Sequence, residues 1–321
     1  MAAQRILITR RVPPPAVELL QNAGCAVDLV DQDDPPSREE LLRRVPGVAG
    51  MITMLSERID AALLDAAGPS LRVVANFAVG FDNIDPETCK QRGVRVTNTP
   101  GVLTDATADL AWTLILATAR RAVEGDRLVR AGKWTGWAPM QFLGLQLSGA
   151  TLGLVGAGRI GTAVGLRSLG FNMHVLYVDG QLCAELERRL HAQRVALPEL
   201  LQGADVVSLH VPLTPQTRHL IGAPELTAMK PTAILINTSR GPVVDEAALV
   251  EALRSRRIAG AGFDVYEHEP RLTPGLADLS NVVLLPHLGS GTTATRQKMS
   301  QMTAENVLAV LQGREPRNPV V

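Results

Sequence analysis

Residues 151–161 read TLGLVGAGRIG, and this stretch carries the most information about the fold. It places Gly156, Gly158 and Gly161 in a GxGxxG pattern, after a strand-like run and before the helix-like TAVGLRSLG. The next strand-like run, HVLYVD, ends in the acidic residue Asp179, at the separation that nucleotide sites use. Glycine-rich turns alone are common, but this order of strand, turn, helix and acidic residue predicts a dinucleotide-binding βαβ unit.

The glycines and the acidic residue each meet a physical requirement of such a site. Gly156 allows the tight turn, Gly158 lets the pyrophosphate approach the backbone, and Gly161 lets the helix pack closely on the strand. The helix N-terminus offers amide donors to the phosphates. Asp179 can accept hydrogen bonds from both ribose hydroxyls and would repel a 2′-phosphate, and no arginine follows it in Gly180–Gln181. We therefore expect NAD(H) as the favoured cofactor, with NADP(H) as the second possibility.

Short apolar runs alternate with amphipathic segments along the whole chain, which predicts an α/β fold with parallel sheets. At 321 residues the chain is too long for one ordinary core, so we expect two domains. Residues 100–288 are assigned to a Rossmann-type, NAD-binding domain with a doubly wound parallel sheet. Because this domain lies in the middle of the chain, residues 1–99 and 289–321 should fold together as a smaller, substrate-binding (catalytic) domain.

Two long helices are expected within this plan. One begins at TDATADLAWTLILATARRAVEGDRLVR, residues 104–130, with Thr104 or Asp105 as its cap, and the other covers roughly residues 293–311. The segment between Trp134 and Gly149 contains glycine, proline and tryptophan without a clean period, so it should be an ordered connection. The tail GREPRNPVV is expected to be a surface segment.

The composition excludes several classes of protein. The 32 basic and 32 acidic residues cancel, which gives no support to binding of nucleic acid or anionic membranes. Cys25, Cys89 and Cys183 lie far apart, which indicates a reducing compartment and neither a disulfide framework nor a zinc site. The start, MAAQRILITRR, lacks the apolar segment of a signal peptide, and the longest apolar helical stretch is too short to span a membrane. We expect a cytoplasmic protein with no metal.

Three polar residues follow successive strands of the predicted dinucleotide-binding sheet. Arg240 follows AILINTS, Glu269 lies near the end of GFDVYEHEP, and His287 follows NVVLLP. Ligands bind at the carboxyl ends of strands in open α/β sheets, so the three side chains are expected to converge. Each alone has an ordinary structural explanation, but together they indicate a catalytic site. An arginine is costly to bury unless an anion meets it, and we expect that anion to be a substrate carboxylate.

The motifs GAGRIG, NTSRGPVVDEAAL, AGAGFDVYEHEP and LLPHLGS together resemble those of the D-isomer-specific 2-hydroxyacid dehydrogenases. The resemblance continues through FAVGFDNID and TNTPGVLTDATADLAW, so it spans nearly the whole chain. These two stretches, with ATARR and WAPMQFLG, are most similar to the glyoxylate and hydroxypyruvate reductases. The resemblance implies a Rossmann-type domain inserted into a smaller flavodoxin-like substrate domain. Asn172 stands where relatives commonly have glycine before the second strand, which affects a turn and no functional role.

The resemblance also implies a reaction, in which a small 2-oxo acid such as glyoxylate or hydroxypyruvate is reduced to the D-2-hydroxy acid. Arg240 corresponds to the residue that grips the substrate carboxylate through paired hydrogen bonds. His287 corresponds to the general acid that protonates the carbonyl oxygen while hydride reaches the carbonyl carbon. Glu269 corresponds to its partner, whose carboxylate stabilises and orients the imidazolium ring.

Further residues carry over by resemblance to the binding of substrate and cofactor. Trp137 matches a tryptophan that in related reductases reaches across a dimer interface, which implies a homodimer, although it can equally be an ordinary interface or core aromatic residue. The other substrate-binding candidates are Leu55, Val79 and Gly80. The other cofactor-binding candidates are Thr107, Arg159, Ile160, His210, Pro212, Thr217, Thr238, Asp264 and Gly289.

Other functions remain open at this point. D-lactate dehydrogenase and phosphite dehydrogenase share the fold, and the arginine, glutamate and histidine do not exclude them. Formate dehydrogenases have glutamine in place of Glu269, which argues against that activity. An NAD-sensing binding protein similar to transcriptional corepressors is the alternative from another class. The absence of an extended interaction tail or basic patch counts against it.

Overall fold

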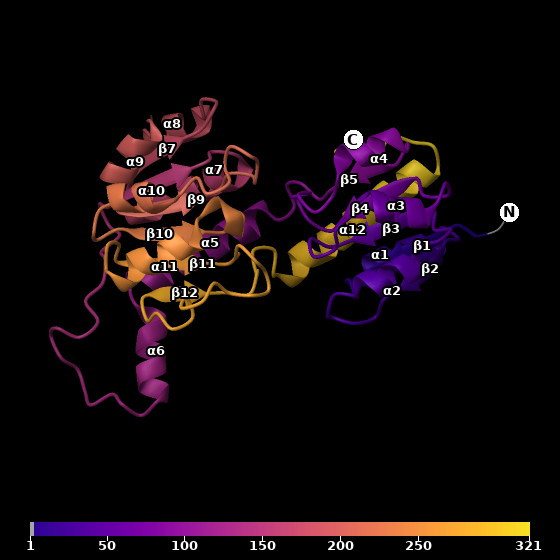
Figure 1. Cartoon of the computed structure of the whole chain (residues 1–321). Helices are drawn as coiled ribbons and strands as arrows, with labels where there is room; N and C mark the ends of the chain where they lie inside the picture. The colour runs from indigo at the N-terminus through magenta and orange to yellow at the C-terminus, as the bar shows by residue number, and fades with distance from the viewer. Residues whose placement is uncertain (1–2) are drawn as a thin grey trace. The chain divides into compact units, whose positions relative to one another are not determined.

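The computed structural model describes residues 3–321, and these form two compact units (Figure 1). The first unit runs to Leu103 and resumes at Ser290, and the second unit comprises Thr104–Gly289. Each unit is built around one parallel sheet. The predicted α/β fold class is therefore confirmed. Within residues 3–321, none of the helices combines the length and the apolar character that crossing a membrane requires.

The first unit contains a five-stranded parallel sheet in the order β2-β1-β3-β4-β5, the order found in flavodoxin-like folds. Its core consists of the apolar faces of these strands and of the helices that cover them. The strands are β1 (Arg5–Ile8), β2 (Ala26–Leu29), β3 (Gly50–Thr53), β4 (Val73–Asn76) and β5 (Arg95–Thr97). The helices are α1 (Pro15–Asn22), α2 (Arg38–Arg44), α3 (Ala61–Ala67), α4 (Pro86–Gln91) and α12 (Thr293–Leu311).

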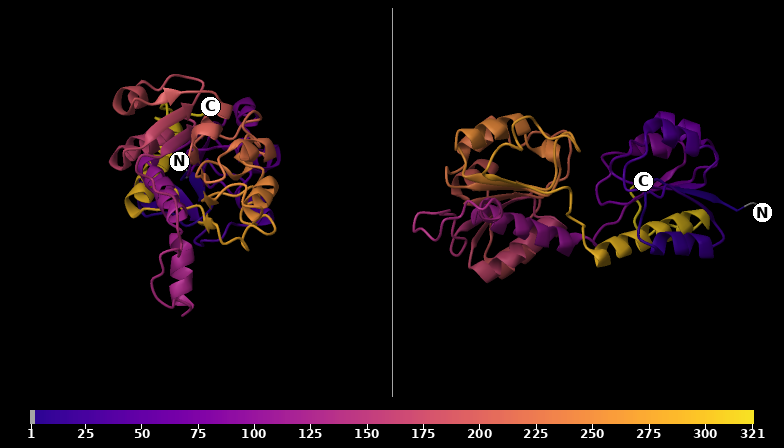
Figure 2. Two further views of the ribbon diagram at one scale, coloured as in Figure 1. Left: turned by 90° about the vertical axis from the view of Figure 1, so that its left-hand side faces the viewer. Right: turned by 90° about the horizontal axis from the view of Figure 1, so that it is seen from below.

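Helix α12 brings the end of the chain back to the first unit, where it packs beside α1 (Figures 1 and 2). The Ser300 hydroxyl accepts a hydrogen bond from the Ala16 amide at 2.9 Å and donates one to the Pro13 carbonyl oxygen. The tail was expected to be a surface segment, but its end pairs with β5, since the Val320 amide donates to the Val96 carbonyl oxygen. The bounds expected for α12 are correct.

The second unit contains a seven-stranded parallel sheet in the order β12-β11-β10-β9-β6-β7-β8. The first strand of this sheet in sequence, β6, lies in its middle. Strands β7 and β8 follow on one side of β6, and strands β9 to β12 follow on the opposite side, which is the doubly wound topology. The strands are β6 (Thr151–Val155), β7 (His174–Val178), β8 (Gln193–Arg194), β9 (Val206–Leu209), β10 (Ile234–Asn237), β11 (Gly260–Phe263) and β12 (Val282–Leu284). The helices are α5 (Thr104–Ala119), α6 (Ala122–Arg130), α7 (Arg159–Arg167), α8 (Ala184–Leu190), α9 (Leu197–Gly203), α10 (Ala223–Ala228) and α11 (Glu246–Arg254), with short 3₁₀ turns at Ser168–Phe171 and Gly241–Val243.

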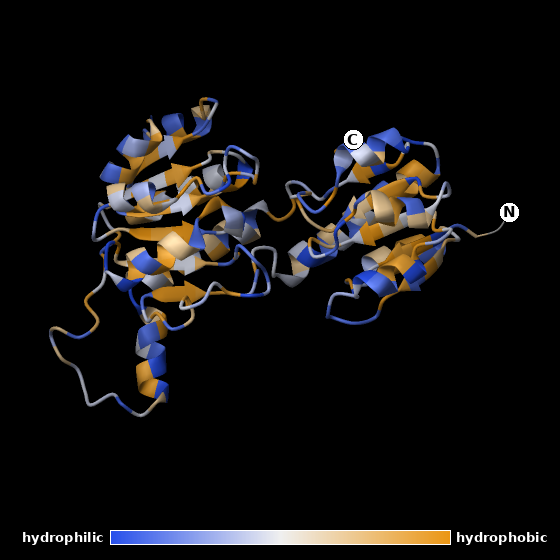
Figure 3. Cartoon of the chain, in the orientation of Figure 1, coloured by the Kyte–Doolittle hydropathy of each residue, from blue (hydrophilic) through white to orange (hydrophobic). Residues whose placement is uncertain are grey.

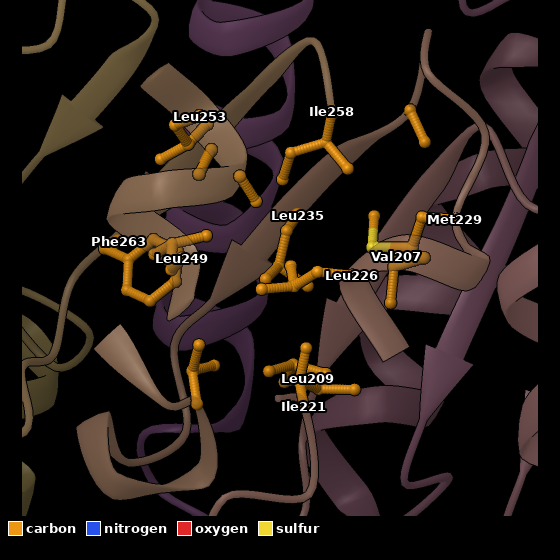
Figure 4. Close-up of a cluster of buried hydrophobic side chains, with 14 of the residues drawn as sticks. Val207, Leu209, Ile221, Leu226, Met229, Leu235, Leu249, Leu253, Ile258 and Phe263 are labelled. Atoms are coloured by element: carbon orange, nitrogen blue, oxygen red, sulfur yellow. The ribbon is translucent and has the colours of Figure 1, made fainter. Parts of the chain in front are cut away.

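Two apolar cores cover the two faces of this sheet, because alternate strand residues point to opposite sides. Leu235 of β10 packs with Leu249 and Leu253 of α11 on one side (Figure 4). Its neighbours Ile234 and Ile236 belong to the core on the other side, with α5. Apolar residues therefore concentrate in the strands and polar residues on the outer helices (Figure 3).

The prediction of one long helix from Thr104 to Arg130 is wrong in one respect, because this segment forms two helices. Helix α5 ends at Ala119, and Arg121 adopts a left-handed backbone conformation with φ of 54°. The Arg121 guanidinium binds the Glu124 carboxylate and lies over the Phe142 ring. The second helix, α6, buries none of its residues and projects from the second unit (Figures 1 and 2).

Candidate functional site

The glycine turn between β6 and α7 has the backbone geometry that the sequence pattern requires. Gly156 has φ of +98°, and a Cβ atom there would lie 2.8 Å from the His210 carbonyl carbon. A Cβ atom at Gly161 would lie 2.0 Å from the Gly156 carbonyl oxygen, so helix and turn approach too closely for any side chain. Gly158 precedes Arg159, the first residue of α7, and no neighbouring atom lies within 4 Å of a Cβ atom placed on it. This turn therefore leaves open space at a helix N-terminus, as a pyrophosphate group needs.

Asp179 lies at the end of β7 beside this turn. Its Oδ2 accepts a hydrogen bond from the Ala157 amide at 2.8 Å, and its Oδ1 accepts one from the Gln181 amide at 3.0 Å. Arg194, on the short strand β8, donates through Nε to the Asp179 carbonyl oxygen at 3.0 Å and through Nη2 to the Gly180 carbonyl oxygen at 3.1 Å. Sequence reasoning missed Arg194 because the arginine is adjacent to the acidic turn in space and not along the chain.

Further candidates follow β9 and β10 in the same unit. The His210 Nε2 atom and the Ser208 hydroxyl lie 2.9 Å apart, and burial lowers the pKa of His210 to about 3, so its ring is neutral. His210 Nδ1 and the Thr238 hydroxyl are among the buried side-chain atoms of the described residues that have no hydrogen-bond partner. The Thr217 hydroxyl donates to the Pro212 carbonyl oxygen at 2.6 Å and so fixes that loop. Two buried polar atoms without protein partners fit a site that a polar ligand completes.

His287 and Glu269 meet directly. The distance from His287 Nδ1 to Glu269 Oε2 is 3.0 Å, and Glu269 Oε1 accepts a hydrogen bond from the Tyr266 amide at 3.0 Å. Burial opposes ionisation of Glu269, but the hydrogen bond and charge of His287, the Tyr266 amide and the charge of Arg240 together hold its pKa below the ordinary value. The second unit therefore brings an ionised carboxylate against an imidazole ring, as expected from the strand ends.

Arg240 directly follows β10 on a turn that Asn237 stabilises. The Asn237 amide group donates to the Arg240 carbonyl oxygen at 2.9 Å, and Asn237 Oδ1 accepts from the Ser239 amide at 3.0 Å. The Arg240 Nη1 atom donates to the Ser239 carbonyl oxygen at 2.8 Å. The charge of Arg240 acts on Glu269, so the arginine belongs to the same electrostatic environment as the Glu269–His287 pair.

Asp264, Thr107 and Gly289 form a cluster beside His287. The Asp264 carboxylate accepts hydrogen bonds from the Leu288 amide at 2.6 Å and the Gly289 amide at 2.8 Å. The Thr107 hydroxyl donates to the Gly289 carbonyl oxygen at 3.1 Å. Burial raises the pKa of Asp264 to about 6, against the lowering effect of these amides and of the His287 charge. His287 itself has φ of 55°, a strained conformation that this cluster holds in place.

Leu55, Val79 and Gly80 belong to the first unit and follow the carboxyl ends of β3 and β4. Two asparagine side chains, which no sequence motif indicated, fix both of these loops. Asn76 donates to the Gly80 carbonyl oxygen at 2.8 Å, and Asn83 donates to the Met54 carbonyl oxygen at 3.0 Å. Asn76 and Asn83 also hydrogen-bond to each other at 3.1 Å, so the two loops are held together.

Trp137 lies in the connection between α6 and β6, which forms no helix or strand. Its side chain is 83% exposed, so the described part of the chain does not cover it. Among residues 3–321, no group of three or more histidine, cysteine, aspartate or glutamate side chains is arranged to hold a metal ion.

Comparison with known proteins places this site in a family. Residues 112–289 match the model of the D-isomer specific 2-hydroxyacid dehydrogenase, NAD binding domain. A glyoxylate reductase of Thermococcus onnurineus is 49% identical over 316 residues, which cover 97% of this chain and 94% of that protein. A glyoxylate reductase of Aeropyrum pernix is also 49% identical, over 100% of this chain and 96% of its own length.

Solved structures agree with the sequence relatives. The TT0316 protein from Thermus thermophilus superimposes with a TM-score of 0.93 at 49% identity, covering 99% of this chain and all of that one. An NADPH-dependent glyoxylate/hydroxypyruvate reductase of Sinorhizobium meliloti, in complex with NADP and malonate, gives a TM-score of 0.87 at 34% identity and covers 100% and 97% of the two chains. The protein described here therefore belongs to the D-isomer-specific 2-hydroxyacid dehydrogenases, and it is an oxidoreductase of 2-oxo and 2-hydroxy acids that uses a nicotinamide dinucleotide.

Proposed function

We propose that the protein reduces glyoxylate or hydroxypyruvate to the D-2-hydroxy acid, with Arg240 as carboxylate clamp, His287 as general acid/base and Glu269 as its partner. The observation that carries the proposal is the 3.0 Å contact between His287 Nδ1 and Glu269 Oε2. The ionised Glu269 accepts a hydrogen bond from the Nδ1–H group of His287. The other ring nitrogen, Nε2, is therefore left to face a substrate. Arg240 supplies the positive charge that a 2-oxo acid carboxylate requires.

The reduction needs one hydride and one proton on the substrate carbonyl. Bound nicotinamide supplies the hydride to the carbonyl carbon. His287 gives the Nε2 proton to the carbonyl oxygen as negative charge develops there, and it becomes neutral. Glu269 makes the imidazolium easier to form again, because a carboxylate within hydrogen-bond distance stabilises the charged ring. The step is reversible, so the same residues would serve oxidation of the hydroxy acid.

The cofactor would lie along the carboxyl ends of the second unit's strands. Gly156, Gly158 and Gly161, with the first turn of α7 at Arg159 and Ile160, provide space and amide donors for the pyrophosphate. Asp179 would bind the adenosine ribose. His210, Pro212, Thr217 and Thr238 would lie along the cofactor, and Thr107, Asp264 and Gly289 would lie at the nicotinamide end. The unpartnered His210 Nδ1 and Thr238 hydroxyl support this placement.

Glyoxylate and hydroxypyruvate are proposed because the relatives named above are glyoxylate or glyoxylate/hydroxypyruvate reductases. In the first unit, the Asn76–Asn83 contact holds Val79 and Gly80 near Leu55, which supports these three residues as a substrate-binding group. We also propose a homodimer, because the apolar side chains of Trp137 and its neighbours are exposed on the projecting segment. The free cysteines Cys25, Cys89 and Cys183 support a cytoplasmic location.

A steady-state assay tests the substrate assignment. Oxidation of NADH and NADPH is measured with glyoxylate, hydroxypyruvate and pyruvate at equal concentrations. The proposal predicts turnover with one of the first two acids, a preference for NADH, and little turnover with pyruvate. Faster turnover with pyruvate would favour a D-lactate dehydrogenase. NAD⁺ reduction with phosphite, without 2-oxo acid turnover, would favour phosphite dehydrogenase, and tight NADH binding without any turnover would favour a sensor.

A further inference from the structure

Glu246 is a buried carboxylate that the proposed mechanism leaves without a role. It begins α11 and has no exposed surface. The N-terminus of α11 is capped by the neighbouring Asp245, whose side chain accepts from the Ala248 amide, so Glu246 is not needed as the cap. A fully buried carboxylate is costly unless hydrogen bonds compensate it, so the groups that it binds indicate what it does.

Both Glu246 oxygens bind the segment that carries Glu269. Its Oε1 accepts a hydrogen bond from the Glu267 amide at 2.7 Å, and its Oε2 accepts one from the Thr273 hydroxyl at 2.6 Å. One attachment precedes Glu269 and the other follows it. These two hydrogen bonds fix the segment on both sides of Glu269.

The orientation of Glu269 depends on this same backbone. Glu269 Oε1 accepts from the Tyr266 amide at 3.0 Å, next to the Glu267 amide that Glu246 holds. Its other oxygen, Oε2, faces His287 Nδ1 at 3.0 Å. A shift of the backbone at Tyr266–Glu267 would therefore turn the carboxylate away from His287.

Glu246 also connects the Glu269 segment with the segment that carries Arg240, because Arg240 lies only six residues before Glu246 in the sequence. The two segments are in tight contact, because a Cβ atom at Gly241 would lie 1.8 Å from the Tyr266 carbonyl carbon. His219 makes a second connection, since its amide donates to the Pro242 carbonyl oxygen at 2.8 Å. The His219 ring in turn lies 2.7 Å from Glu267 Oε1.

We propose that Glu246 is a positioning residue, which holds residues 266–273 so that Glu269 meets His287 in register with Arg240. The inference rests on the proposed function, because it assigns Glu246 a role in the Glu269–His287 proton relay. Glu246 does not touch the reacting atoms. Its loss should change the pH profile of the reaction as well as the stability of the fold.

The test is the pH profile of kcat/KM for reduction of glyoxylate, measured for the wild-type protein and for Glu246→Ala, Glu246→Gln and Glu269→Gln. The reduction requires a proton from His287, so the alkaline limb of the profile is sensitive to the contact between His287 and Glu269. When Glu269 no longer stabilises the imidazolium, this limb should move to lower pH, by about one pH unit. Glu246→Ala is expected to move it in the same direction as Glu269→Gln. Glu246→Gln should restore most of the wild-type profile, because its amide can still accept from Glu267 and donate to Thr273.

Asp205→Asn is the matched control, because Asp205 is a partly buried carboxylate of the same unit that binds the Thr151 amide and Lys230 near the start of β9. It should lower Tm without moving the limb. Thr273→Val removes one of the two attachments and should give a smaller shift, which keeps the test available if Glu246→Ala does not fold. A lower Tm with an unmoved limb in both Glu246→Ala and Thr273→Val would overturn the positioning role alone. An unmoved limb in Glu269→Gln would overturn the proposed relay, and the role of Glu246 with it.

Discussion

At the scale of single residues, Arg240 and His287 would serve different steps, and their substitutions should differ accordingly. Arg240→Ala removes a charge-assisted carboxylate contact and is expected to raise KM for glyoxylate about 10- to 100-fold while also lowering kcat. His287→Ala removes the proton donor and should mainly lower kcat, by about 100-fold or more. Steady-state kinetics with NADH separates the two effects. An unchanged KM in Arg240→Ala would disprove the carboxylate clamp.

Asp264 should make stability depend on pH. Burial raises its pKa to about 6, although the Leu288 and Gly289 amides and the His287 charge oppose this. A carboxyl group whose pKa is higher in the folded than in the unfolded chain contributes stability at low pH, and that contribution is lost as the pH rises through the folded value. Asp264→Asn cannot ionise. The free energy of unfolding of this variant, minus that of wild type, should therefore increase by about 2 to 3 kcal/mol between pH 4 and pH 7.

Urea unfolding of both proteins at several pH values checks this expectation. Groups that do not interact with Asp264 titrate equally in the two proteins, so their contributions cancel in the difference between them. A difference that stays constant across the range would mean that Asp264 ionises near its ordinary pKa. The backbone amides and the His287 charge would then balance the cost of burial.

The sequence predicts some of these residues better than others, for a physical reason. Arg240, Glu269 and His287 could be selected because each follows a strand, and strand ends meet at one edge of a parallel sheet. The role of Glu246 in holding the Glu269 segment could not be predicted, because its partners Glu267 and Thr273 are distant in sequence. The same holds for Arg194 and for the Asn76–Asn83 pair, whose side chains bind backbone atoms of other loops.

At the scale of elements, we expect β7 and β8 together to determine the cofactor preference. Asp179 ends β7, and Arg194 on β8 binds the carbonyl oxygens of Asp179 and Gly180. Asp179→Ala removes the charge that would repel a 2′-phosphate and leaves this cation near the turn. The ratio of kcat/KM for NADPH to that for NADH should rise about tenfold or more, which corresponds to roughly 1.4 kcal/mol.

Arg194 provides the comparison for this prediction. The double variant Asp179→Ala/Arg194→Ala should lose part of the gain with NADPH, because a guanidinium is a good phosphate ligand. Kinetics with both cofactors measure the effect. If the single and double variants have equal ratios, Arg194 only supports the turn. If wild type already prefers NADPH, the assignment of Asp179 to the ribose is wrong.

Periodicity could predict most elements but not their interruptions. The apolar runs before Gly156, Asp179, Arg240, Glu269 and His287 correspond to β6, β7, β10, β11 and β12. Strand β8 has only two residues, Gln193–Arg194, and no apolar pattern that could predict it. The break between α5 and α6 was missed because ATARRAVEG has no proline or glycine at the point of the break. The left-handed conformation of Arg121 depends on its contacts with Glu124 and Phe142, which a helical period does not encode. Asn172, in contrast, has φ of 52°, which explains why a residue that tolerates this conformation replaces glycine.

At the scale of the whole molecule, the segment from α6 to β6 exposes several large apolar side chains. Val129, Trp134, Trp137, Met140 and Leu143 are each more than half exposed. Contiguous exposed apolar side chains commonly mark protein interfaces. Sedimentation of the purified protein should therefore give the mass of a dimer, and a monomer at micromolar concentration would contradict the proposed assembly.

A mixing experiment tests whether Trp137 completes the site of the other subunit. Trp137→Ser and Arg240→Ala are each expected to have low activity as separate homodimers. If Trp137 acts across the interface, a mixed dimer contains one site with an intact Arg240 and an intact Trp137 from the partner subunit. Mixing the two variants under conditions that exchange subunits should then restore a measurable fraction of wild-type turnover. If Trp137 acts within its own subunit, each mixed dimer contains two defective sites and no activity returns, and full activity of Trp137→Ser alone would show that the indole serves only the interface.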